Sequence, residues 1–337
     1  MSSMELSRQR WDEISAGFSA ARVVVLGDVM LDHYVHGQVR RISPEAPVPV
    51  VELQRETFMP GGAGNVARNV AALGGAVDLI GVVGDDAAAG QLREALRETA
   101  VDTSGLVVEA GRPTTSKMRI AAHRQQVVRV DRETRRGLSD ATRAAVLDTL
   151  RARIAGSQAV VIADYAKGVI DQVLFDGILE AADAADVPVL VDPKTPCNLV
   201  MKGCALLTPN RKETFELAGI EDPGFVGPDP ASDDQLSSAI SAVLARHQMG
   251  ALLVTLSEAG LMLMESGKPA VHVPTMAREV ADVSGAGDTV IASFALARVA
   301  GADLLEATHV ANHAAGVVVG KSGTAQATIA EVRESLV

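Results

Sequence analysis

Cysteine is scarce in this chain: Cys197 and Cys204 are the two cysteines among 337 residues. Two cysteines without a recognisable spacing pattern exclude the class of small secreted domains that are held together by disulfides. We interpret both as buried or incidental thiols. The cytoplasm is therefore the expected compartment.

Aromatic residues are also rare, at 3% of the chain with a single tryptophan. The core must therefore be packed with Val, Leu, Ile and Ala, and a hydrophobic content of 47% is enough to build a large one. No apolar run reaches the roughly 18 residues that a membrane-spanning helix needs. Residues 1–11 are polar and charged, and we do not expect a secretory signal there.

Basic residues are outnumbered. The chain has 31 Lys and Arg against 42 Asp and Glu, which gives a net charge of −11 at pH 7. This balance excludes a broad nucleic-acid-binding surface, because such a surface needs clustered cations. Small anionic substrates stay open, since a cleft can be locally basic in an acidic protein.

Short apolar runs alternate with helical patterns through most of the chain, which is typical of an α/β domain. Such alternation predicts a mostly parallel central sheet with helices on both faces, and ligands bind such sheets at the carboxyl ends of the strands. The expected strands are residues 22–26, 77–83, 159–163, 187–191, 205–208 and 251–256. The expected helices are residues 64–73, 87–99, 171–186 and 212–218, with two more that begin at residues 289 and 304.

Two segments depart from this alternation and predict a small β lid outside the main sheet. Residues 32–53 are β-prone pieces broken by three prolines, and residues 114–130 alternate in part between apolar and polar positions. We expect a helical N-terminal extension over residues 1–20 and one domain over residues 21–337. The lid is contributed by about 32–53 and 114–130 of that domain.

The most informative segment is Asp-Val-Ser-Gly-Ala-Gly-Asp-Thr at residues 282–289, directly before an apolar helical run. Gly285, Ala286 and Gly287 let a ligand approach the backbone closely, and the first turn of a helix offers N–H groups that favour an anion. A carboxylate beside an anion site suits a base that removes a proton from a hydroxyl group, so Asp288 is a candidate catalytic residue. An Asp that only caps the helix is the alternative.

This segment resembles the C-terminal hallmark of the ribokinase-like (PfkB) sugar kinases. The resemblance covers nearly the whole chain from about residue 22. Three further segments agree with the family and occur in its order: Gly-Gly-Ala-Gly-Asn-Val-Ala at 61–67, Asn-Arg-Lys-Glu at 210–213 and Thr-Leu-Ser-Glu-Ala-Gly at 255–260.

The resemblance implies the ribokinase-like fold and ATP-dependent phosphorylation of a sugar hydroxyl group. Asp288 would be the catalytic base, beside an anion hole formed by the N–H groups of residues 285–287. Mg²⁺ is an implied cofactor, K⁺ is a candidate stimulating cation, and a homodimer joined through the lid is the implied assembly.

Four other stretches, at residues 27–32, 41–50, 164–168 and 316–321, are similar to one branch of that family. The branch phosphorylates the anomeric hydroxyl of D-glycero-D-manno-heptose 7-phosphate, an early step toward the ADP-heptose of bacterial lipopolysaccharide. Many of its members carry a fused C-terminal nucleotidyltransferase. Since the chain has no His-x-Gly-His motif of such a domain, we expect a kinase that stands alone.

On the nucleotide side, two pairs of residues keep a structural alternative. Asn210 and Glu213 also have the spacing of a helix capping box, and Asp282 and Ser284 fit a turn with a cap. By resemblance, Asn210, Ser257, Gly260 and Asn312 contact the nucleotide, Glu213 binds Mg²⁺ through water, and Asp282 and Ser284 are candidate ligands of the monovalent cation.

On the sugar side, a carboxylate accepts hydroxyl hydrogens and an amide both donates and accepts, while a phosphate group calls for Arg or Lys. Asp28 is a second choice for the sugar, with a structural role as its alternative. The candidates are Asp32, Gly61, Gly62 and Asn65 for the sugar and Lys117, Arg119 and Lys194 for its 7-phosphate.

Three alternative functions stay open. A kinase of the same family could act on ribose or a fructose phosphate, since the anion hole is common to all of them. Gly62-x-Gly64-x-x-Ala67 fits the dinucleotide fingerprint, so a nicotinamide-dependent oxidoreductase is a rival, although no strand is expected directly before Gly61. The third is a non-catalytic protein that senses a sugar or a nucleotide. Such a protein would not need a base at Asp288.

Overall fold

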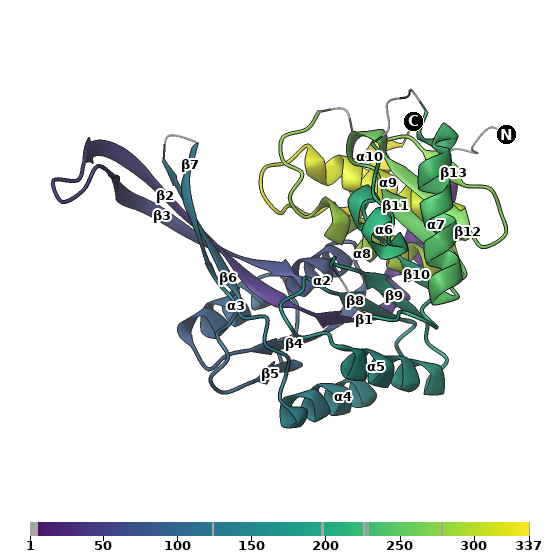
Figure 1. Ribbon diagram of the computed structural model, residues 1–337, viewed down its shortest axis with the longest axis horizontal. Coiled ribbons are helices and arrows are strands. Elements are labelled where there is room, and N and C mark those ends of the chain that lie inside the picture. Colours follow the sequence, from purple (N-terminus) through teal and green to yellow (C-terminus); the bar gives the residue numbers. More distant parts are fainter. Residues whose placement is uncertain are drawn as a thin grey trace.

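A nine-stranded sheet forms the centre of the main body (Figure 1). The computed structural model describes residues 6–122, 125–196, 199–224, 227, 229–277 and 279–336, so the predicted thiol at Cys197 lies outside the described residues. The strands from β11 to β5 pair in parallel, and β12 and β13 add an antiparallel edge. Across the sheet the order is β13 (Val271–Val273), β12 (Leu261–Glu265), β11 (Ala251–Thr255), β10 (Leu206–Leu207), β9 (Val189–Asp192), β8 (Ala159–Ala163), β1 (Arg22–Gly27), β4 (Ala76–Val83) and β5 (Leu106–Val108).

Helices cover both faces of this sheet, because the apolar residues of its strands alternate between two cores. In β1, Val23 and Val25 belong to one core while Val24 and Leu26 belong to the other. A strand buried on both sides is continuously apolar in sequence. The first core is covered by α1 (Arg8–Ala16), α2 (Ala63–Ala72), α3 (Ala87–Arg97), α8 (Ala286–Val299), α9 (Leu304–Val319) and α10 (Ile329–Ser335), and the second by α4 (Asp140–Ile154), α5 (Gln172–Ala184), α6 (Arg211–Ala218) and α7 (Asp234–His247).

The predicted fold class, a mostly parallel α/β sheet with a small β lid, is confirmed. The strand predicted at 159–163 has the bounds of β8, and the other predicted strands overlap β1, β4, β9, β10 and β11. Cys204, the cysteine that the structure describes, is buried, and burial raises the pKa of its thiol to about 12. Within the described ranges, no helix has both the length and the apolar character needed to cross a membrane.

The lid is a four-stranded sheet that projects to one side of the main body (Figure 1). The strand β3 (Pro49–Gly62) continues beyond residue 53, where the predicted lid segment ends, and leads directly into α2 at Ala63. The expectation that no strand precedes Gly61 is therefore wrong. Pro60 is tolerated in the strand because that strand lies at the edge of the sheet. The order is β3 (Pro49–Gly62), β2 (Val29–Ile42), β6 (Ser116–Ala122) and β7 (Gln125–Arg132).

The helix of the N-terminal segment packs against the C-terminal helices. Trp11 of α1 is fully buried and lies edge-to-face with Phe18, with 5.7 Å between ring centroids. Arg10 Nε lies 2.7 Å from Glu306 Oε1 of α9, and Arg333 Nε of α10 lies 2.7 Å from Asp12 Oδ1. The division into an extension and one domain stays a prediction.

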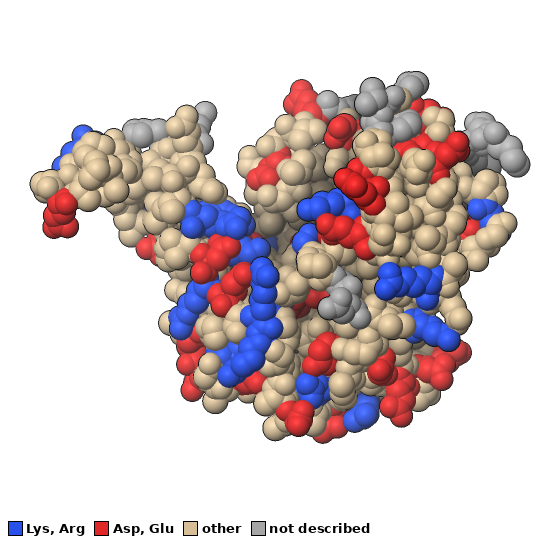
Figure 2. Space-filling view, in the orientation of Figure 1, with Lys and Arg blue, Asp and Glu red and all other residues tan. Residues whose placement is uncertain are grey.

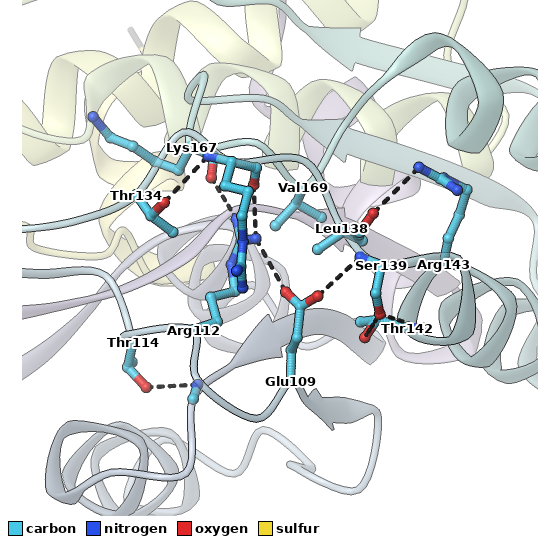
Figure 3. A network of polar contacts seen from close by, with 12 residues as sticks. Glu109, Arg112, Thr114, Thr134, Leu138, Ser139, Thr142, Arg143, Lys167 and Val169 are labelled. Carbon is cyan, nitrogen blue, oxygen red and sulfur yellow. Dashed lines mark hydrogen bonds and ion pairs between the residues drawn. The ribbon is translucent and has the colours of Figure 1, made fainter.

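A buried ion pair links three connecting segments beside the lid (Figure 3). Arg112 Nη1 lies 3.1 Å from Glu109 Oε2, and both side chains are about 95% buried. The guanidinium also donates to the carbonyl oxygens of Arg136 and Lys167 at 2.8 and 2.6 Å, and Glu109 Oε1 accepts from the Ser139 N–H at 2.9 Å. The pair therefore ties the end of β5 to the segment that leaves the lid and to the loop after β8.

We expect Arg112→Met to lower the free energy of unfolding by about 3–5 kcal/mol, because Glu109 would keep a buried charge without its partner. Urea unfolding monitored by circular dichroism measures this loss. Arg151→Met is the control, since Arg151 pairs with Asp148 on the surface and should lose less than about 1 kcal/mol. A loss of equal size in both variants would contradict the role of the buried pair.

Candidate active site

The predicted site residues gather where parallel strands end, beneath the lid. The strands β1, β8 and β9 end at Gly27, Ala163 and Asp192, and α8 packs against β8, β9 and α2. Figure 2 shows a hollow between the lid and the main body, with Lys and Arg side chains on both of its walls. The carboxyl end of an open α/β sheet is the expected place for a ligand.

No side chain caps the first turn of α8. Its N-cap residue Gly285 has a φ of +81°, which glycine adopts without strain. Apart from α2, which follows Gly62, every other described α-helix has a side chain that accepts a hydrogen bond from its first turn. The N–H groups of Gly285 and Gly287 have no acceptor among the described residues and stay open to an anion, whereas that of Ala286 donates to the Val283 carbonyl oxygen at 3.3 Å.

Asp288 lies in the first turn of α8 and is 95% buried. Burial raises the pKa of its carboxyl group to about 6, even though hydrogen bonds from Tyr165 and Asn65 lower it. The Tyr165 hydroxyl donates to Oδ1, and Asn65 Nδ2 donates to Oδ2 at 2.6 Å. A carboxylate with a pKa this close to neutrality suits a general base.

Tyr165 is a site residue that the sequence did not predict. Burial, followed by the charge of Asp288, holds the pKa of its phenol well above the usual value, so the hydroxyl remains a donor. Its position directly after Asp164, at the end of β8, is the signal that could have identified it. The loop that carries it is fixed by Asp28, whose carboxylate accepts the N–H groups of Tyr165, Lys167 and Val169 at 2.8, 3.0 and 3.3 Å. Asp28 thus has the structural role that the sequence kept as an alternative.

Glycine is required at two positions beside these carboxylates. A Cβ atom at Gly285 would lie 2.6 Å from Asn65 Nδ2, and one at Gly61 would lie 2.6 Å from Asp32 Oδ2. Any side chain at either position would displace a predicted site residue. Asn65 on α2 faces α8 and donates one of its N–H groups to Asp288. Its contact with a sugar stays a prediction.

The lid places two of the three predicted cations beside Asp32. Lys117 lies opposite Asp32 in the register of β2 and β6, and Arg119 lies opposite Tyr34. Arg119 Nη1 donates to Asp32 Oδ1 at 2.5 Å, and its guanidinium lies 5.1 Å from the centre of the Tyr34 ring. Burial lowers the pKa of Lys117, and its ammonium group has no hydrogen bond or ion pair with the described residues. Lys117 is therefore the cation most open to an added anion.

The third predicted cation, Lys194, lies on the opposite side of the site. Its Nζ is 2.6 Å from Glu213 Oε1. The other carboxylate oxygen accepts the Asn210 N–H at 3.0 Å, and Asn210 Oδ1 accepts the Glu213 N–H at 2.9 Å. Asn210 and Glu213 therefore form the capping box of α6, which the sequence kept as an alternative.

Asp282 joins two loops in front of α8. Its carboxylate oxygens accept the N–H groups of Ser284 and Gly323 at 2.9 and 3.1 Å. This is the turn that the sequence kept as an alternative, and Ser284 is exposed. Cation binding by the pair stays a prediction.

A cavity of about 450 Å³ brings three of the predicted nucleotide residues to the N-terminus of α8. Ser257, Gly260 and Asn312 line it together with Ala286 and Gly287. Asn210 does not line the cavity. It forms a β-bridge with Thr255, which does line it. The lining residues that the sequence did not predict are mainly apolar and include Val280, Val283, Val290, Ala315 and Val319.

We expect Asp288 to titrate with a midpoint near pH 6, and Tyr165→Phe to raise that midpoint, because the variant removes a donor to the carboxylate. The measurement is ¹³C NMR of side-chain carboxyl groups across pH 4–9. Asp288→Asn identifies the signal by its loss. A signal that titrates near pH 4 in the wild type would contradict the effect of burial.

Comparisons with known proteins identify the family of this chain. Residues 20–330 match a family model described as pfkB family carbohydrate kinase. The chain is 47% identical over 316 residues to the bifunctional protein HldE of Caulobacter vibrioides, covering 94% of this chain and 63% of that protein. It is 47% identical over 320 residues to the bifunctional protein HldE of Halorhodospira halophila, covering 95% and 64%. The chain thus spans less than two thirds of the length of these relatives.

Two solved structures show the same fold. Arabidopsis thaliana ribokinase complexed with ribose and ATP aligns with a TM-score of 0.69 and 23% identity, over 94% of this chain and 97% of that one. Phosphofructokinase-2 from Escherichia coli in complex with potassium aligns with a TM-score of 0.75 and 19% identity, also over 94% and 97%. At such identities the likeness concerns the fold alone.

Proposed function

The chain belongs to the pfkB family of carbohydrate kinases, which are phosphotransferases that use ATP, and from this premise we propose that it phosphorylates D-glycero-D-manno-heptose 7-phosphate. The product is the 1,7-bisphosphate, a precursor of ADP-heptose for lipopolysaccharide. The observation that carries the reaction is Asp288, buried between two donors at the uncapped end of α8. The heptose substrate is supported by the sequence stretches that resemble that branch and by the identity to the HldE proteins.

In this reaction Asp288 is the general base. Its ionised carboxylate accepts the proton of the anomeric hydroxyl as that oxygen forms a bond to the γ-phosphorus of ATP. The bond from this phosphorus to the β,γ-bridging oxygen breaks, and ADP leaves with the electron pair. The N–H groups of Gly285 and Gly287 stabilise the charge on the phosphoryl oxygens during transfer, and that of Ala286 joins them by leaving the Val283 carbonyl oxygen.

The sugar phosphate lies under the lid in this proposal. Asp32 accepts its hydroxyl hydrogens while Arg119 holds the carboxylate in place. The glycines of β3 let the backbone come close, and Asn65 reaches the sugar with its second N–H. Lys117, whose ammonium group has no partner in the described chain, binds the 7-phosphate. Lys194 is the weaker candidate for this phosphate, because Glu213 already engages it.

The cavity beside Ser257, Gly260 and Asn312 holds the nucleotide in this proposal. Its apolar lining suits a purine base, and a nucleotide with its phosphates at Ala286 and Gly287 would present them to the N-terminus of α8. No group of three or more carboxylates, histidines and cysteines in the described chain could hold a metal ion. A metal cage built from side chains therefore does not fit, and we propose that Mg²⁺ arrives with the phosphates, with Glu213 reaching it only through water. Asp282 and Ser284 stay the candidates for K⁺.

We also propose a homodimer joined through the lid, in the cytoplasm. The strands β3 and β7 are unpaired edges, and apolar side chains on β7 are exposed, with Val128 and Val130 at 45% and 51%. A second copy would cover such an edge. The mass of the protein in solution, measured by light scattering, tests this assembly.

The function is tested by ADP release with ATP and Mg²⁺ in the presence of heptose 7-phosphate, fructose 6-phosphate or ribose. We expect turnover with heptose 7-phosphate, and a loss of about 10²–10⁴ in kcat for Asp288→Asn, which keeps the shape of the residue and removes the base. Turnover confined to another sugar would replace the substrate and keep the mechanism. Absence of ADP with folded wild-type protein would overturn the proposal.

The role of Lys117 is tested by Lys117→Met. We expect KM for heptose 7-phosphate to rise by about 10–100-fold with KM for ATP unchanged, because one charged contact to the phosphate is lost. Lys212→Met is the matched control, since Lys212 is 81% exposed on α6 and pairs with Glu216. Equal KM values in the wild type and Lys117→Met would remove Lys117 from the phosphate site.

A further inference from the structure

Gln326, which lies 261 positions after Asn65 in the chain, contacts that asparagine beside Asp288. Gln326 lies in the connection between α9 and α10, and its Nε2 donates to Asn65 Oδ1 at 3.3 Å. Asn65 Nδ2 in turn donates to Asp288. We propose that Gln326 is a positioning residue for phosphoryl transfer, which fixes the direction of the Asn65 amide and through it the carboxylate of Asp288. This inference rests on the proposed role of Asp288 as the base.

The donors and acceptors in this chain of hydrogen bonds permit one orientation of both amides. At one end, Arg68 can only donate, and its Nη2 donates to Gln326 Oε1 at 2.8 Å. Gln326 Nε2 donates in addition to the carbonyl oxygen of Thr324 at 2.9 Å, which can only accept. The amide nitrogen of Gln326 must therefore face Asn65. Asn65 then presents its oxygen to Gln326 and its nitrogen to Asp288, whose ionised carboxylate can only accept.

Burial makes this orientation matter. Asn65, Arg68 and Asp288 are 0%, 7% and 5% exposed, so water does not replace a lost hydrogen bond at these groups. A reversed Asn65 amide would point its oxygen at the carboxylate, which would then have Tyr165 as its one remaining side-chain donor. Buried donors and acceptors without partners are disfavoured, so the network selects the amide direction that serves the base.

Arg68 depends on the same glutamine. Burial lowers the pKa of its guanidinium, and no ion pair involves it among the residues that the structure describes. Its second contact, with the Pro60 carbonyl oxygen, is long at 3.5 Å, and its Nε is buried without a hydrogen bond. Gln326 Oε1 is thus the nearest acceptor of this charge. The arrangement holds the glutamine side chain toward the interior.

The connection that carries Gln326 is itself fixed at several points. Lys321 Nζ donates to the Gln326 carbonyl oxygen at 2.8 Å and lies 2.6 Å from Glu331 Oε1 of α10. The Gly323 N–H bonds to Asp282, in the loop before α8. The backbone on both sides of the glutamine is therefore held without its side chain, so both variants should fold. Gln326→Leu removes the acceptor of Arg68 and should lower the free energy of unfolding, whereas Gln326→Glu keeps that acceptor and separates this loss from the effect on kcat.

The experiment compares Gln326→Leu and Gln326→Glu with the wild type in the heptose 7-phosphate assay. Neither variant donates to Asn65, and the first adds no charge. We expect kcat to fall by about tenfold in both, with KM for ATP unchanged. The acidic midpoint of the kcat profile should rise in Gln326→Leu, because Asp288 loses the fixed donor that lowers its pKa.

The pH readout reports on Asp288 because its surroundings stay unchanged. The titratable and charged groups that act on it are Tyr165 from the loop after β8, Asp32 from β2, Lys117 from β6 and Asp192 from β9. Gln172→Leu is the matched control. Gln172 on α5 also bonds to a carboxylate and to backbone, with Asp176 and Val200 as partners, and its loss should leave kcat and the midpoint unchanged.

A double-mutant cycle separates positioning through Asn65 from a general structural effect. If Gln326 acts through Asn65, Gln326→Leu should add nothing to the loss in Asn65→Leu. Wild-type kcat and midpoint in both glutamine variants, or full additivity with Asn65→Leu, would overturn the inference. If Asp288→Asn turned over as fast as the wild type, the base itself would be wrong, which is a different failure from that of Gln326.

Discussion

The candidate site is organised around one buried carboxylate, that of Asp288, which accepts hydrogen bonds from two side chains. Removal from water favours the neutral form of Asp288, and the Tyr165 and Asn65 donors oppose that effect. Asn65 reaches it because glycine at position 285 leaves room for the amide, and α8 begins there without a capping side chain. A carboxylate left entirely in water would be a weak base, and one buried without donors would stay protonated. The observed balance lies between these limits.

The same strand ends hold further acidic groups, and the protein deals with each in a different way. Asp28 is satisfied by three backbone N–H groups. Burial, together with Asp28, raises the pKa of Asp164 to about 7, and burial with the charge of Asp288 holds the pKa of Asp192 well above its usual value. Neutralising these groups reduces the repulsion of an anionic ligand in a chain of net charge −11. The lid residues Lys117 and Arg119 add positive charge opposite these acidic groups at the strand ends.

Strong local sequence signals predicted most of the central sheet and several residues of the candidate site. Apolar strand runs gave the sheet, and the glycine-rich segment before α8 identified Asp288. Helices α4, α7 and α10 were not predicted. The predicted lid segment ended at residue 53, short of the end of β3, and Pro60 argues against a strand unless its edge position is known. Tyr165, Arg68 and Gln326 were missed for another reason. Their importance comes from contacts across large sequence separations, such as the 261 positions between Asn65 and Gln326, which no local pattern encodes.

Two of the connections between the lid and the main body are very short. A single residue, Asp28, separates the lid strand β2 from β1, and β3 passes into α2 without an intervening loop. Asn65 follows three positions after Gly62, where that strand ends. The position of β3 and that of the first turn of α2, which carries the Asn65 amide, are therefore coupled. Under the proposed function, a lid that closes over the sugar would also shift the amide that contacts Asp288.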